Sequence, residues 1–97
     1  MSYRIKKYTF AQAKKLGVEV KPSSVKGKKI DVFKNGEKVA SGGALGMNDY
    51  PTYMEKEKNG SVAKGTAKRR REAYKTRHEK DRHVRGSAGY YADKLLW

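Results

Sequence analysis

Two histidines and two carboxylates fall within six consecutive residues, 78–83, which read HEKDRH. Such side chains are common metal ligands, and zinc proteases place two histidines four residues apart so that both share one helix face. His78 and His83 are five residues apart, about 140° around a helix, and therefore diverge. Pairs three or four residues apart could share a face here, but the surrounding positive charge disfavours a cation. We expect no catalytic residue, no metal site and no cofactor, and we keep a metal-dependent nuclease as a third hypothesis.

The same segment lies in a strongly basic stretch, residues 66–85, with nine Lys or Arg and three acidic side chains. The stretch has no Gly or Pro and is rich in helix formers, so we expect one long helix. It lacks a wide apolar stripe: Ala67, Ala73 and Tyr74 would seat its first half, and its second half would be exposed. A phosphate backbone is the expected partner of this surface. The residues predicted to contact phosphate are Arg69, Arg70, Arg71, Lys75, Arg77 and Arg82.

The composition makes the whole chain basic. Its 97 residues include 24 Lys or Arg and 10 Asp or Glu, for a formal net charge of +14. This excess favours an anionic partner, most commonly nucleic acid, with acidic lipid and acidic protein as the other classes. The length fits a single small basic domain, residues 1–97. Because there is no cysteine, disulfides and thiolate zinc sites are excluded.

The positive charge lies in two regions that flank a nearly neutral middle. Residues 1–38 have a net charge of +8 and residues 61–97 of +7, whereas residues 39–60 have −1. The first region depends on Lys, while six of the seven Arg lie from Arg69 onward. Arg binds phosphate with a rigid fork of donors and Lys with a point charge, so we expect the oriented contacts in the second region. The secondary contacts predicted in the first region are Lys6, Lys7, Lys28 and Lys29.

No apolar run approaches the length of a membrane span, so we expect no membrane partner. The first residues alternate basic and aromatic side chains and lack the apolar core of a secretory signal. We therefore expect an intracellular protein.

The clearest local signal is the Asn-Gly dipeptide at 35–36, which separates two alternating segments and is typical of a two-residue β-hairpin turn. With that loop, Lys34 faces Glu37 and Val32 faces Val39. A three-residue loop would shift these pairs by one.

Weaker signals surround the hairpin. Residues 3–6 alternate as a short strand does, and Thr9 with Gln12 forms a capping box for a short helix that ends at Gly17. Residues 18–20 alternate again and indicate a second strand.

A glycine-rich segment, residues 42–46, follows the hairpin. It is interpreted as a flexible exit; a phosphate-binding nest is disfavoured, because no Lys-Ser or Lys-Thr follows and Asp49 lies where the anion would bind. Asn48 or Asp49 then caps a helix with Pro51 in its first turn.

The chain ends in an apolar and aromatic segment, Tyr90–Trp97. Left loose, it would promote aggregation, so we expect it to pack back on the protein, with Ser87 as the cap of a short helix. Tyr91 and Leu95 would share one face of that helix. The alternative is a tag that docks into another protein.

Three patterns carry a resemblance to a protein family. They are RREAYxxRHxxD followed by GSAGYYA and LLW between residues 70 and 97, YRIKKYTF at 3–10, and the hairpin. Together they resemble small basic proteins of large DNA viruses of algae and amoebae, over most of the chain. Gly42-Gly43 and residues 59–65 depart from the pattern locally. The resemblance carries no catalytic residues; it implies a viral setting, in the virion or in the host nucleus or cytoplasm, with genome packaging as a candidate role.

The expected fold is therefore α+β: a small antiparallel sheet centred on a β-hairpin, a short N-terminal helix, a long basic C-terminal helix and a terminal aromatic segment. The expected function is non-enzymatic nucleic-acid binding, to DNA rather than RNA, with weak sequence preference. The alternative is a structural virion or minor capsid-associated protein that binds acidic protein partners through Tyr90–Trp97.

Overall fold

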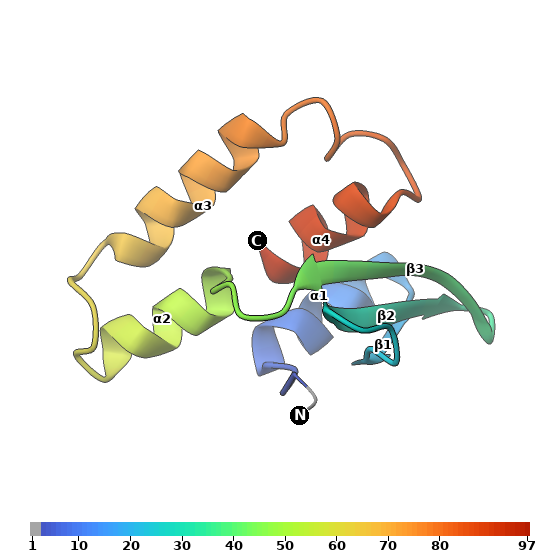
Figure 1. Cartoon of the computed structure of the whole chain (residues 1–97), viewed down its shortest axis with the longest axis horizontal. Coiled ribbons are helices and arrows are strands. Elements are labelled where there is room, and N and C mark those ends of the chain that lie inside the picture. Colours follow the sequence, from blue (N-terminus) through green and yellow to red (C-terminus); the bar gives the residue numbers. More distant parts are fainter. Residues whose placement is uncertain (1–2) are drawn as a thin grey trace.

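The structure, a computed structural model, describes residues 3–97 and has the expected α+β fold. Three antiparallel strands in the order β1-β2-β3 form one sheet, and α4 lies between this sheet and α3 (Figure 1). We call residues 50–77 the α2–α3 arm, because α2 and α3 form a V on the side away from the sheet (Figure 1). The elements are α1 (Lys7–Leu16), β1 (Glu19–Pro22), β2 (Lys28–Lys34), β3 (Glu37–Ala44), α2 (Tyr50–Lys58), α3 (Thr66–Arg77) and α4 (Ala88–Leu96).

The β2–β3 hairpin has the predicted two-residue turn. Asn35 and Gly36 have φ angles of 53° and 82°, as a type I′ turn requires. Lys34 lies opposite Glu37, as expected.

The predicted pairing of Val32 with Val39 is wrong, because β3 contains a β-bulge. The register shifts between Phe33 and Val32, so Val32 pairs with Ala40. Val39 is the additional residue and is 40% exposed. The bulge keeps Val32 in the core and moves the extra side chain to solvent, which an alternating pattern alone does not signal.

The core lies between one face of the sheet and the two helices α1 and α4. α1 packs against β1, α4 packs against β3, and the two helices contact each other. The buried residues of this cluster are Ala13, Val18, Val20, Ile30, Val32, Tyr91, Ala92, Leu95 and Leu96.

Gly42 and Gly43 continue β3 instead of forming a flexible exit, whereas Gly46 lies in the turn that follows the strand. Gly42 is buried, and a Cβ there would lie 3.6 Å from the carbonyl oxygen of Ala88. Gly43 has a φ of 79°, and a Cβ there would lie 2.6 Å from Cδ1 of Leu96. Gly42 and Gly43 thus let α4 approach the strand closely.

The start of α1 differs from the prediction, although it ends at Gly17 in the left-handed conformation as expected. The helix begins at Lys7, so Thr9 is not its cap, and residues 3–6 form no strand. Thr9 is buried and donates to the carbonyl of Leu95 at 2.8 Å, while Gln12 donates to that of Lys94 at 3.2 Å. The two side chains therefore satisfy carbonyls at the end of α4.

The terminal segment packs on the protein, as predicted. Ser87 caps α4 by accepting a hydrogen bond from the backbone N–H of Tyr90. Tyr91 and Leu95 are both buried in the core, at 7% and 0% exposure. The segment is thus a structural part of this fold, and a partner could reach these side chains only by opening the core.

The long basic helix expected over residues 66–85 is shorter in the structure. α3 ends at Arg77, and the chain then forms consecutive turns until Ser87. Past Tyr74 the sequence has little apolar surface to bury, and helices of this length depend on tertiary packing. Within residues 3–97, no helix is long and apolar enough to cross a membrane.

Candidate nucleic-acid interface

Carboxylates position both helices of the α2–α3 arm. Asp49 caps α2 as predicted, accepting a hydrogen bond from the backbone N–H of Thr52 at 3.0 Å. Glu57, near the end of α2, accepts from the backbone N–H groups of Gly65 at 2.9 Å and Ala67 at 2.6 Å. These two bonds lower the pKa of Glu57 from its ordinary value. Glu57 thereby caps α3 in place of a local side chain.

Two arginines of α3 lie over tyrosines of α2. The guanidinium of Arg71 is 4.6 Å from the ring centroid of Tyr50, and that of Arg70 is 5.8 Å from the ring centroid of Tyr53. Such cation–π contacts hold the helices together while leaving the arginine charge in place.

The far end of α3 is tied to α4 by a buried carboxylate. Lys75 Nζ is 2.7 Å from Asp93 Oδ1, and Arg82 Nη1 is 3.8 Å from Asp93 Oδ2. The Asp93 side chain is fully buried, and its Oδ2 has no hydrogen-bond partner. A buried charge depends strongly on its counter-ion, so Lys75 stabilises the arm's attachment.

Aromatic rings make a second link between α3 and α4. Tyr74 stacks on Trp97 with a centroid separation of 4.5 Å, and on His78 with a separation of 4.3 Å. At these separations the two rings must lie on opposite faces of Tyr74. The ring centroid of Tyr53 lies 6.4 Å from that of Trp97, with the two planes tilted by 48°. Burial, with the nearby carboxylates of Asp93 and Asp81, raises the pKa of the Tyr74 hydroxyl.

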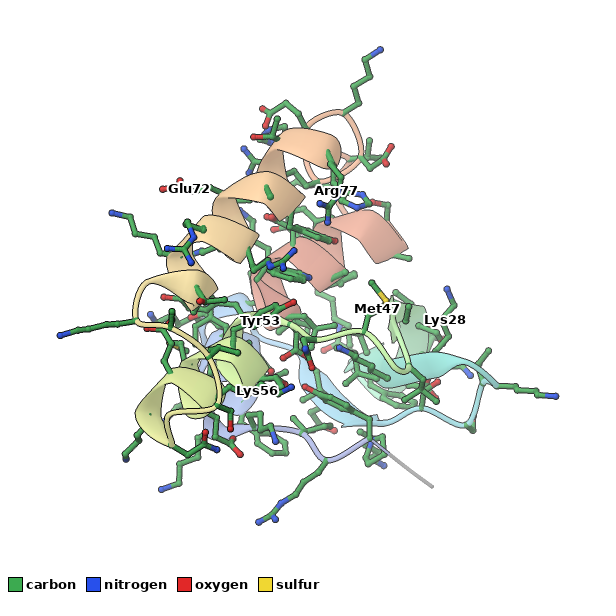
Figure 2. The ribbon with its side chains drawn as sticks, turned by 60° about the vertical axis from the view of Figure 1, so that its left-hand side comes forward. Lys28, Met47, Tyr53, Lys56, Glu72 and Arg77 are labelled. Atoms are coloured by element: carbon green, nitrogen blue, oxygen red, sulfur yellow. The ribbon has the colours of Figure 1, made fainter. Side chains whose placement is uncertain are left out.

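A groove with a volume of about 940 Å³ lies between the arm, β3 and α4. Its lining includes the aromatic rings just described and the basic side chains of Lys28, Arg70 and Arg77. Figure 2 shows Arg77 on α3 and Lys28 on the sheet side across from it, with Met47 beside Lys28. Glu72 lies on the outer side of α3, away from this space (Figure 2). The groove therefore combines flat rings with cations from opposing walls.

Five of the ten basic residues predicted to contact phosphate are exposed. The exposed side chains are Arg69, Arg70, Arg77, Lys7 and Lys28. Of these, Arg70, Arg77 and Lys28 line the groove. Three predicted residues from distant parts of the chain are thus brought together.

The other five predicted residues are at least partly buried, and each has an internal partner. Arg71 lies over Tyr50, Lys75 and Arg82 approach Asp93, and Lys6 is 3.4 Å from Glu55. These four remain partly exposed.

Lys29 differs from the rest because it is buried, at 3% exposure. Its Nζ donates to Asp49 Oδ2 at 2.9 Å and lies 5.1 Å from the ring centroid of Tyr3. Tyr3 donates to the same carboxylate oxygen at 2.6 Å. Burial opposes the charge of Asp49, but the hydrogen bonds that it accepts outweigh this effect and lower its pKa from the ordinary value. Lys29 thus stabilises the cap of α2 and is enclosed away from the surface.

The two histidines occupy different environments. His78 ends the aromatic stack and lines the groove, with 39% of its side chain exposed. His83 Nε2 lies 2.8 Å from Glu79, outside the groove, and Arg82 contacts the same carboxylate at 2.8 Å. The bonds from His83 and Arg82 lower the pKa of Glu79 from its ordinary value. Within residues 3–97, no three His, Cys, Asp or Glu side chains lie close enough together to hold a metal ion.

The sequence did not predict the groove, and it did not predict that Trp97 and Tyr53 line it. The four-residue spacing of Tyr74 and His78 is the one local signal, since it places both rings on one helix face. Trp97 joins them only because α4 returns beneath α3, which is a tertiary effect.

No protein-family model, no curated protein and no solved structure matches this chain.

Proposed function

We propose that this protein is a non-enzymatic nucleic-acid-binding protein that contacts DNA with weak sequence preference. The observation that carries the proposal is the convergence of three exposed cations, Arg70, Arg77 and Lys28, around a groove lined with aromatic rings. Arg69 is also exposed on α3, outside the groove lining. Cations and flat rings together are the two chemical components of sites that hold a nucleic-acid strand.

The distribution of acidic groups adds support. Among the described residues, three carboxylates, Asp31, Asp49 and Asp93, but only one ammonium, Lys29, are buried. The accessible surface is therefore more positive than the formal charge of +14. Asp31 illustrates how the fold retains these charges: burial opposes its ionisation, but hydrogen bonds from Ser23, Ser41 and Ser24 outweigh this and hold its pKa well below the ordinary range.

Contacts to phosphate carry no sequence information, so weak sequence preference follows from this surface. The choice of DNA, and a role in packaging a viral genome, are proposals that derive from the resemblance to small basic viral proteins. A metal-dependent nuclease stays the third hypothesis.

The salt dependence of binding tests the proposal. The affinity for a DNA oligonucleotide should fall steeply between about 50 and 200 mM salt, because each phosphate contact releases counterions. Replacing Arg69 and Arg70 together by Ala should lower the slope of log affinity against log salt by about two. The matched control is replacement of Lys14 and Lys15, two exposed cations of α1 away from the groove, which should leave the slope almost unchanged.

Two results would contradict the proposal. One is an affinity that does not change with salt. The other is equal slopes for the two double variants. Poly-glutamate in the same assay tests the alternative of an acidic protein partner, and binding as tight as that of DNA would favour that alternative.

A further inference from the structure

We infer that the groove binds unpaired nucleobases, so that the protein prefers single-stranded nucleic acid, with a base stacked on His78 and its flanking phosphates held by Arg70, Arg77 and Lys28. This inference rests on the proposed function and specifies the form of nucleic acid that the site takes.

His78 provides the free aromatic face. Tyr74 is covered on one face by Trp97 and on the other by His78, so a further ring can join this stack only at its ends. At one end of the stack Trp97 has the ring of Tyr53 6.4 Å away, whereas His78 at the other end is 39% exposed and lines the groove. A base that stacks on His78 would extend an existing column of rings. Such stacking is tolerant of sequence, because every base has a flat face.

The cations lie where the flanking phosphates would pass. Arg77 precedes His78 in the chain and lines the same groove, and Lys28 lies on the sheet side across from Arg77 (Figure 2). Arg70 lies two turns before Arg77 on α3 and also lines the groove. A strand entering between the walls would meet cations from both walls; among residues 3–97, the one acidic group in the lining is Asp81, whose carboxylate lies 3.7 Å from His78 Nδ1.

The dimensions of the site favour a single strand. A volume of about 940 Å³ is that of a pocket for a small ligand, which holds a nucleotide or two and not a base-paired helix. Bases in a duplex present only their edges, whereas an unpaired base can leave its neighbours and insert its face. Asn48, which lines the groove, offers an amide group to the edge of an inserted base.

The test compares three probes with the same number of phosphates at one salt concentration. They are an oligothymidylate of about ten nucleotides, an oligomer of the same length without bases, and a short duplex. The oligothymidylate should bind about tenfold more tightly than the abasic oligomer, the loss expected when base stacking is removed. It should also bind more tightly than the duplex. Trp97 is the only tryptophan and lines the groove, so its fluorescence should change with oligothymidylate and not with the abasic oligomer.

Pairs of variants, one inside the groove and one outside it, test whether the groove is responsible for the preference. His78→Ala should reduce the preference for oligothymidylate over the abasic oligomer to less than about threefold, whereas His83→Ala, outside the groove, should leave it unchanged. Arg77→Ala should weaken oligothymidylate binding more than Arg85→Ala, which removes the same charge from an exposed position outside the groove. Equal effects within each pair would overturn the inference.

The outcomes separate this inference from the function on which it rests. Salt-sensitive binding that is equal for all three probes, with unchanged Trp97 fluorescence, would overturn the groove inference and leave nucleic-acid binding in place. Absence of salt-sensitive binding to every probe would overturn both. A preference for oligothymidylate that His78→Ala removes and His83→Ala retains would support both.

Discussion

The sheet with α1 and α4 and the α2–α3 arm are stabilised by different forces. All nine residues of the apolar core cluster belong to α1, α4, the sheet or the turn between α1 and β1. The arm contributes only Pro51 and Ala67 to the buried residues among those described. It is held instead by the Glu57 cap, cation–π contacts, aromatic stacking and the Lys75–Asp93 pair.

This difference predicts that the two regions respond differently to salt. Apolar burial stabilises a fold at any ionic strength, whereas polar contacts at a surface weaken with salt and open more readily. Three of the five exposed arginines in residues 3–97, Arg69, Arg70 and Arg77, lie on the arm, whereas the apolar core lies between the sheet, α1 and α4. A ligand that bridges α3 and the sheet would stabilise the less stable region.

The largest effect should come from the core. Leu95→Ala removes a fully buried side chain and should lower the free energy of unfolding by about 2–5 kcal/mol in urea denaturation. The control, Val84→Ala, changes an apolar residue that is 57% exposed and should cost less than about 0.5 kcal/mol. Similar losses of unfolding free energy in the two variants would contradict the conclusion that the core between the sheet, α1 and α4 stabilises the protein.

The next effect tests the close packing of α4 on β3. Gly43→Ala places a Cβ 2.6 Å from Leu96 and also strains a φ of 79°, so it should cost about 3 kcal/mol. Gly46→Ala has a similar φ of 86° but open space around the Cβ, and strain alone should cost about 1 kcal/mol. The difference between their urea midpoints measures the contact with α4. If the two variants are equally stable, the close approach of α4 to Gly43 does not contribute to the free energy of unfolding.

The third-largest effect should come from the ion pair that attaches the arm to α4. Lys75→Met leaves the buried Asp93 without its closest cation and should cost about 2 kcal/mol, less than a fully buried pair because the Lys75 side chain is 27% exposed. Lys68→Met removes an exposed α3 cation and should change the stability by less than about 0.5 kcal/mol. Loss of the ion pair in Lys75→Met should also shift the fluorescence of Trp97, because the Trp97 ring links α3 to α4. Unchanged fluorescence would mean that the pair does not hold the arm.

Mild acid should give the smallest effect, on the arm through its caps; Asp31 in β2, whose pKa is held well below the ordinary range, loses its contribution only at lower pH. The pKa values of Asp49 and Glu57 are lowered in the folded state, so their contribution is complete above the ordinary values of 3.8 and 4.5 and is lost as the pH falls through the lowered values. Stability should therefore begin to fall below about pH 4.5 and continue to fall under pH 3.8. Glu57→Gln should reduce this dependence. Glu19→Gln, at an exposed position without a side-chain hydrogen bond among the described residues, should not. Stability that rises on acidification would contradict the sign of both shifts.

Local chemistry in the sequence predicts the elements whose boundaries depend on neighbouring residues. The Asn35-Gly36 turn, the Asp49 cap with Pro51, the Gly17 terminator and the Ser87 cap are confirmed, because each motif satisfies a turn or helix end within a few residues.

Features that depend on distant partners were not predicted. Thr9 bonds to a carbonyl 86 residues away, and the groove exists only because α4 returns beneath α3. The burial of Lys29 follows from the position of Asp49, 20 residues later, and a basic residue in an alternating strand gives no sign of it. Basic residues can thus be counted from the sequence, but their availability to a ligand is decided by the fold.

Amide hydrogen exchange with and without oligothymidylate tests the central claim most directly, because it reports local opening and ligand protection together. In the free protein, amides of α3 should exchange at least about tenfold faster than those of β2, where Ile30 and Val32 are fully buried. Oligothymidylate should slow exchange in α3 and around residues 77–78 while leaving β2 unchanged. Protection of free α3 equal to that of β2, or ligand protection confined to α1 and β1, would contradict the account.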